Sequence, residues 1–150
     1  PPTLLSGYAD ANTFTDGHSE NYSTVNIGSD AQSQILVAST QMTKVIIYPL
    51  TTTTGATVIP FLVDADYNVI VVGETYTINT TAGAAYEIVF DSTLSASEPF
   101  YFGTYESIGT SHDSNYGNEK YRWQSGTPQL NTTISGTGTN SARSTQGYGF

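Results

Sequence analysis

The sequence predicts an all-β fold, an antiparallel β-sandwich or barrel, from three observations. Short runs rich in β-branched and aromatic residues recur along the middle of the chain, at the spacing of about 8–12 residues that is typical of these folds. Clusters of Thr, Gly, Asn and Asp separate the runs, and these residues favour turns. No window of helical length carries apolar residues at three- and four-residue spacing.

The expected strands follow one another through the central part of the chain. Between Glu74 and Asn79 polar and apolar side chains alternate, which indicates a strand with one face in a core and one in solvent. Pro49 and Pro60 lie inside strand-like runs, and because proline donates no ladder hydrogen bond, each indicates an edge, a strand end or a bulge. The expected strands cover residues 35–37, 44–48, 58–63, 69–72, 75–78 and 86–90, with turns at 51–55, 64–68, 80–83 and 136–140.

The length of the chain predicts a single domain, residues 1–150, with a core of about residues 31–124. The two ends, residues 1–30 and 125–150, are polar, which predicts extended N- and C-terminal arms. Ordering such arms costs roughly 1–2 kcal/mol of backbone entropy per residue, so they need a surface to pack against. That surface belongs either to the same domain or to a neighbouring subunit.

The charge is strongly acidic, with 4 Lys and Arg residues against 13 Asp and Glu residues and a formal net charge of −9. A nucleic-acid-binding protein needs a basic stripe, and four scattered cations do not form one. The apolar stretches are far shorter than the roughly 20 residues of a membrane helix. We therefore expect neither nucleic acid nor membrane as a partner. The lack of cysteine excludes disulfides and thiolate zinc sites.

A candidate metal site is formed by Asp64, Asp66 and Asn68, whose spacing matches the opening of a calcium loop. An EF-hand loop continues with Gly at its sixth position and Glu at its twelfth, where this chain has Val69 and Thr75. Two interpretations remain open: a plain hairpin turn without a cofactor, which we favour, and an irregular structural Ca²⁺ site.

Histidines are found only at His18 and His112, each in a polar loop that contains or adjoins glycine or serine. A pair brought together by the fold has the chemistry for a transition-metal site or a Ser/His/Asp site, although exposed loop histidines are far commoner. The sequence contains no Gly-x-Ser-x-Gly elbow, no glycine-rich phosphate loop and no His-Glu-x-x-His motif. We therefore expect that the protein is not an enzyme.

Aromatic residues are densest between residues 100 and 123. Strand alternation places Phe100 and Phe102 on one face, as core residues, and Tyr101 on the other, as a contact residue. Tyr and Trp combine an apolar face with a polar edge, which suits structural packing, subunit interfaces and sugar stacking alike. The candidate binding or interface residues are Tyr101, Tyr105, Tyr116, Tyr121, Arg122 and Trp123.

The order of strands and turns resembles that of jelly-roll modules in tailed-phage virions and in some bacterial surface proteins. The resemblance implies a jelly-roll-like β-sandwich used for capsid decoration, fibre attachment or glycan contact, and it implies no catalytic residues. It covers roughly residues 30–125 and is carried by residues 31–38, 42–50, 59–64, 73–76, 85–90 and 100–103.

We expect a non-catalytic structural protein on a virion surface, a capsid decoration or cement protein of bacteriophage type. Its arms would join it to other virion subunits, and we expect a homo-oligomer. One alternative is a secreted, carbohydrate-binding β-sandwich module. Another is an extracellular, pilus-like filament subunit in which a terminal strand completes the sheet of its neighbour.

Overall fold

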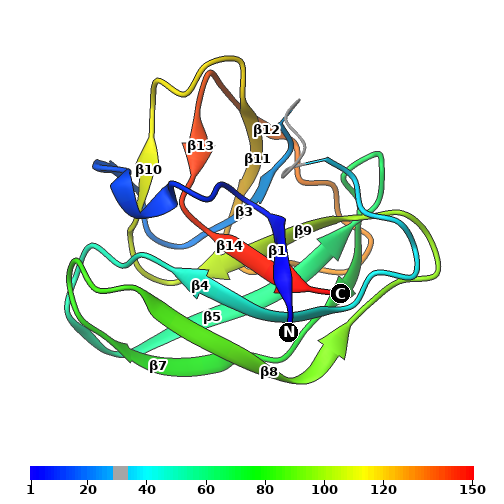
Figure 1. Ribbon diagram of the computed structural model, residues 1–150, viewed down its shortest axis with the longest axis horizontal. Coiled ribbons are helices and arrows are strands. Elements are labelled where there is room, and N and C mark those ends of the chain that lie inside the picture. Colours follow the sequence, from blue (N-terminus) through cyan, green and yellow to red (C-terminus); the bar gives the residue numbers. More distant parts are fainter. Residues whose placement is uncertain (29–33) are drawn as a thin grey trace.

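The computed structural model describes residues 1–28 and 34–150 of the chain, and within these ranges the regular structure is antiparallel β-sheet with one short 3-10 helix (Figure 1). The all-β prediction is therefore confirmed. The largest sheet has seven strands in the order β12-β11-β3-β9-β5-β6, with β7 paired to β5. Its strands are β3 (Tyr22–Asn26), β5 (Thr53–Val63), β6 (Val69–Val72), β7 (Tyr76–Thr80), β9 (Tyr101–Glu106), β11 (Lys120–Ser125) and β12 (Gly136–Thr139).

A four-stranded sheet in the order β1-β14-β4-β8 packs against the large sheet. Its strands are β1 (Thr3–Ser6), β4 (Met42–Ile47), β8 (Tyr86–Leu94) and β14 (Gln146–Gly149). Buried side chains from both sheets, such as Ile47 of β4, Phe90 of β8 and Phe102 of β9, form one hydrophobic cluster between them. This two-layer arrangement is compatible with a β-sandwich.

A three-stranded sheet in the order β13-β10-β2 forms a separate part of the structure. Its strands are β2 (Asp16–His18), β10 (Thr110–Asp113) and β13 (Ala142–Arg143), and the 3-10 helix η1 (Ala11–Thr13) precedes β2. Contacts of β13 with β3 and β11 attach this small sheet to one end of the large sheet. In Figure 1, β10 and β13 lie at the top of the view.

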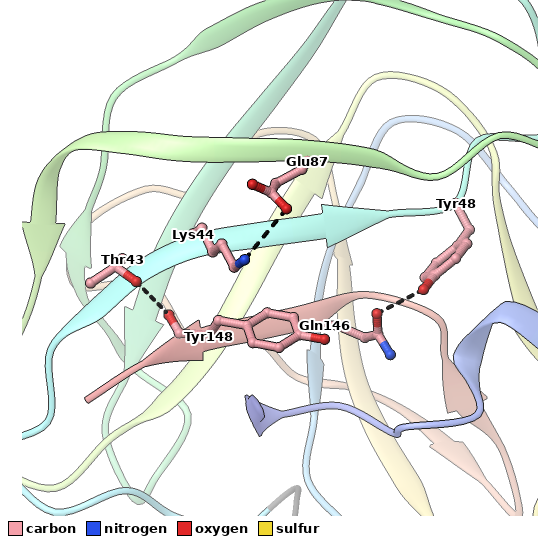
Figure 2. A network of polar contacts seen from close by, with 6 residues as sticks. All are labelled: Thr43, Lys44, Tyr48, Glu87, Gln146 and Tyr148. Atoms are coloured by element: carbon pink, nitrogen blue, oxygen red, sulfur yellow. Dashed lines mark hydrogen bonds and ion pairs between the residues drawn. The ribbon is translucent and has the colours of Figure 1, made fainter. Parts of the chain in front are cut away.

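The ends of the chain are strands of these sheets and not extended arms. β14 lies between β1 and β4 in the four-stranded sheet, and β3 and β12 belong to the large sheet. Figure 2 shows side chains that tie β14 to its neighbour: the Tyr48 hydroxyl donates to Gln146 Oε1 at 2.7 Å, and the Thr43 hydroxyl donates to the Tyr148 carbonyl at 3.3 Å. The expected core of residues 31–124 is too narrow, and its first residues lie outside the described ranges.

Two further expectations need correction at the level of strands. The segment expected at residues 35–37 contributes only an isolated bridge between Leu36 and Phe100, and residues 136–140, expected as a turn, contain β12. Pro60 lies inside β5, at the point where this strand changes partner from β7 to β6. The lack of an N–H group at Pro60 therefore removes no hydrogen bond from the sheet. The Pro60 carbonyl accepts a hydrogen bond from Gly73 N–H at 2.8 Å.

Within residues 1–28 and 34–150 the structure contains no apolar helix that could span a membrane.

Candidate functional site

The candidate residues of β9 and β11 are divided between the two faces of the large sheet. Arg122 pairs with Val25, which pairs with Gly103, so these three residues share one face. Tyr101 and Tyr105 are two residues from Gly103 and point to the same side. Tyr121 and Trp123 flank Arg122 and therefore point to the other side. The predicted set is thus divided between two places.

On the first face, aromatic rings and a cation form a stack. The Tyr101 ring stacks on Tyr67 at a centroid distance of 5.7 Å, and the Arg122 guanidinium lies 4.0 Å from the centroid of the same Tyr67 ring. Both tyrosines pack against the buried cluster around Val25 and Phe61, and burial raises the pKa of Tyr101. The cation–π contact and the burial give this group a packing role.

Two other candidates are also held within the fold. Tyr105 is only 6% exposed and its hydroxyl donates to Asn21 Oδ1 at 2.6 Å. Tyr116 packs with Tyr8 and Phe14, at centroid distances of 4.8 and 5.3 Å, and its hydroxyl donates to Asp10 Oδ1 at 2.9 Å. The second cluster fixes the loop around η1 to the loop that follows β10.

On the second face, five residues line a hollow of about 230 Å³, which we call the aromatic hollow: His18, Ser19, Tyr22, Tyr121 and Trp123. Tyr121 and Trp123 come from β11, and Tyr22 comes from the adjoining strand β3. His18 ends β2 of the small sheet, and Ser19 follows it. The hollow therefore forms where the end of β2 in the small sheet meets strands β3 and β11 of the large one.

The rings of the aromatic hollow contact one another edge to face. Trp123 and Tyr22 lie 5.4 Å apart at an interplanar angle of 90°, and Tyr22 and His18 lie 5.5 Å apart at 85°. The chain of rings continues from His18 to Tyr121 at 5.6 Å and 76°. Such contacts are favourable pair geometries, and they fix each ring at nearly a right angle to the next.

Glycines on the edge strand β12 make room for the two rings of β11. Gly136 pairs with Trp123 and Gly138 pairs with Tyr121. A Cβ atom built on either glycine would collide with the ring of its partner, so each ring lies over the glycine backbone. Aromatic residues that cover glycines of an edge strand in this way stabilise the strand and hold the rings in place.

His18 is neutral at physiological pH because burial, followed by the nearby charge of Arg143, lowers its pKa to about 4. Its Nδ1 lies 3.2 Å from the Ser19 carbonyl, which only accepts, so Nδ1 carries the proton. Nε2 is then an acceptor for the Tyr121 hydroxyl at 3.4 Å. The ring centroids of His112 and His18 lie 5.4 Å apart. Burial also lowers the pKa of His112. The structure thus brings the two histidines together.

The candidate calcium residues form a closed turn. Asp64 Oδ1 accepts hydrogen bonds from the backbone N–H groups of Asp66 and Asn68, at 2.9 and 3.0 Å. The Asn68 side chain contacts Asp64 Oδ2 and accepts from the Thr133 hydroxyl. These contacts are those of a hairpin turn, and across the described ranges no group of three or more His, Cys, Asp or Glu side chains could hold a metal ion.

Sequence reasoning missed His18, Ser19 and Tyr22 as neighbours of Tyr121 and Trp123. The five residues come from segments about a hundred positions apart, and only strand pairing brings them together. The alternation of Gly136 and Gly138 with threonine was one available signal, since alternate glycines on a strand indicate close approach by something large.

Comparison of the chain with protein-family models, curated proteins and solved structures finds no match in any of the three.

Proposed function

We propose that the protein is a non-catalytic, carbohydrate-binding β-sandwich protein and that the aromatic hollow is its sugar site. The observation that carries the proposal is the grouping of Tyr22, Tyr121 and Trp123 with His18 and Ser19 around one surface depression. Aromatic rings offer flat apolar faces to the C–H groups of a sugar, while their polar edges meet its hydroxyl groups.

The size and polarity of the hollow support a small, uncharged ligand. Its volume of about 230 Å³ is below the roughly 300–1,000 Å³ of sites for drug-sized ligands, which favours a single sugar ring. No hydrogen bond within the described chain occupies the Ser19 hydroxyl, the Tyr22 hydroxyl or the Trp123 indole N–H. These groups are therefore available to sugar hydroxyls.

A glycan array followed by calorimetric titration tests this function. Trp123→Ala removes the largest ring of the hollow, and we expect at least about tenfold weaker binding of any glycan that the native protein binds. Phe150→Ala is the control, because Phe150 is 65% exposed and belongs to no part of the hollow. Glycan binding that persists in the folded Trp123→Ala variant contradicts the proposal.

A place on a virion shell or in a filament stays a prediction. This prediction rested on terminal arms that needed a surface to pack against. Pairing of β1, β3, β12 and β14 within the chain supplies that surface. Electron microscopy of the purified protein, alone and with candidate shells, separates the possibilities. Polymers or decorated shells support assembly, and their absence together with glycan binding supports the secreted module.

A further inference from the structure

We propose that the aromatic hollow selects uncharged sugars that carry an acetamido group, over plain hexoses and over acidic sugars. This inference rests on the sugar-binding function proposed above. It comes from the angle between the rings, the available polar groups and the charge of the lining.

Trp123 has the position of a floor. Its ring lies over the backbone of Gly136 on the edge strand, so one face of the indole is supported from below. Trp123 is partly exposed and lines the hollow. In the proposed site, a sugar ring stacks on the side of the indole away from Gly136. A pyranose is nearly flat, so stacking on this single surface uses one of its apolar faces.

Tyr22 has the position of a wall. Its ring stands at 90° to the indole, with the centroids 5.4 Å apart. A flat sugar on the floor cannot stack on a second surface at a right angle to the first. Only a group that projects sideways from the sugar ring can reach the wall. The equatorial groups of a plain hexose end in polar hydroxyls, whereas an equatorial acetamido substituent ends in an apolar methyl group that suits an aromatic face. The corner formed by Trp123 and Tyr22 therefore favours binding of a sugar whose side group carries a methyl group.

The polar groups that line the hollow suit an acetamido group better than the methyl group of a 6-deoxy sugar. An acetamido group has one N–H donor and one carbonyl acceptor. The Ser19 hydroxyl both donates and accepts, and the Tyr22 hydroxyl does the same at the edge of the wall. A 6-deoxy sugar also carries a methyl group, but it offers no amide to these hydroxyls.

The charge of the lining disfavours acidic sugars. None of the five lining residues carries a positive charge at physiological pH, because His18 is neutral. Arg143 is 2% exposed, and its guanidinium lies 6.0 Å from the centroid of the Tyr121 ring. The chain as a whole has a net charge of −9, so a carboxylate on the sugar meets repulsion and no partner.

A cationic ligand is disfavoured by the contacts between the rings. An aromatic cage for a quaternary ammonium group needs ring faces that surround the cation. Here, successive rings meet edge to face at centroid distances of 5.4–5.6 Å, so their faces are not all turned toward one central point.

The experiment is calorimetric titration with the methyl glycosides of N-acetylglucosamine, glucose, glucuronic acid and a 6-deoxy hexose, and with choline. We expect the acetamido sugar to bind about tenfold more tightly than glucose, and the acidic sugar not to bind. Tyr22→Ala should reduce binding of the acetamido sugar to that of glucose, whereas Tyr22→Phe keeps the wall and most of the preference. Trp123→Ala should abolish binding of both sugars.

The outcomes separate this inference from the proposed function. Equal affinity for glucose and the acetamido sugar, or tighter binding of the acidic or 6-deoxy sugar, overturns the selectivity and leaves sugar binding intact. Binding of choline alone, or no sugar binding that depends on Trp123, overturns both. Thermal melting of each variant shows whether it is folded, and Tyr22→Phe remains informative if Tyr22→Ala is not.

Discussion

Arg143 and Glu106 are ionisable side chains buried in the fold, and each is 2% exposed. Glu106 Oε1 accepts hydrogen bonds from Thr104 and Thr145, and Arg143 donates to the Thr110 hydroxyl at 2.6 Å. Among the described residues, Glu106 Oε2 and two guanidinium nitrogens of Arg143 have no hydrogen-bond partner. Burial raises the pKa of Glu106, and the Arg143 charge lowers it in part. Each side chain therefore favours the charged form of the other, although no ion pair joins them directly.

Removal of one member of this pair should destabilise the protein strongly. Arg143→Met removes both the charge that partly offsets the burial of Glu106 and the hydrogen bond to Thr110, and we expect a loss of about 1–3 kcal/mol in the free energy of unfolding. The double variant with Glu106→Gln should lose less than the sum of the single variants. Urea unfolding measures each value. Lys44→Met is the control, because the exposed Lys44–Glu87 pair of Figure 2 is worth about 1 kcal/mol or less.

His18 makes stability depend on pH. Its pKa is 6.5 in an unfolded chain and about 4 in the fold, so the unfolded state takes up the proton first as the pH falls. The contribution of His18 is complete above about 6.5 and is lost progressively down to about 4. Urea unfolding across this window should show a smaller decrease for His18→Asn than for the native protein. Equal decreases contradict the assignment.

At this scale, the sequence predicted the face toward which a side chain points better than it predicted the residues that the side chain contacts. Alternation correctly placed Phe100 and Phe102 in the core and Tyr101 on the other face. It could not predict that Tyr101 stacks on Tyr67, or that His18 contacts Tyr121, because these pairs are joined by the register of strands distant in sequence.

At the scale of elements, the edge strand β12 supports the hollow through its glycines. Gly138→Ala places a methyl group where the Tyr121 ring lies, so the ring must move while the strand remains paired. We expect the variant to fold and to bind sugar about tenfold more weakly, as measured by titration. Thr137→Ala, on the opposite face of the same strand, should bind as the native protein does. A Gly138→Ala variant with native affinity contradicts this role of β12.

Strands with apolar runs were predictable, and polar or glycine-rich strands were not. Residues 44–48, 69–72 and 86–90 correspond closely to β4, β6 and β8, because β-branched and aromatic residues mark them. β2, β12 and β14 consist mainly of polar residues and glycine, which on their own indicate loops. Their strand structure arises from pairing with neighbours, which no local pattern records.

At the scale of the whole molecule, the last strand is a central part of the fold. β14 pairs with β1 on one side and β4 on the other, and Gly147 packs so closely that a Cβ atom would lie 2.7 Å from the Phe102 ring. Deletion of residues 146–150 should therefore abolish the cooperative thermal transition, followed by circular dichroism. Deletion of Pro1 and Pro2 should change stability by no more than about 0.5 kcal/mol. A truncated protein that melts like the native one would restore the view of this segment as an arm.

The pairing of Thr3 with Gly149 places both ends of the chain side by side, as Figure 1 shows. A linker joined to either end would leave the molecule from the same side.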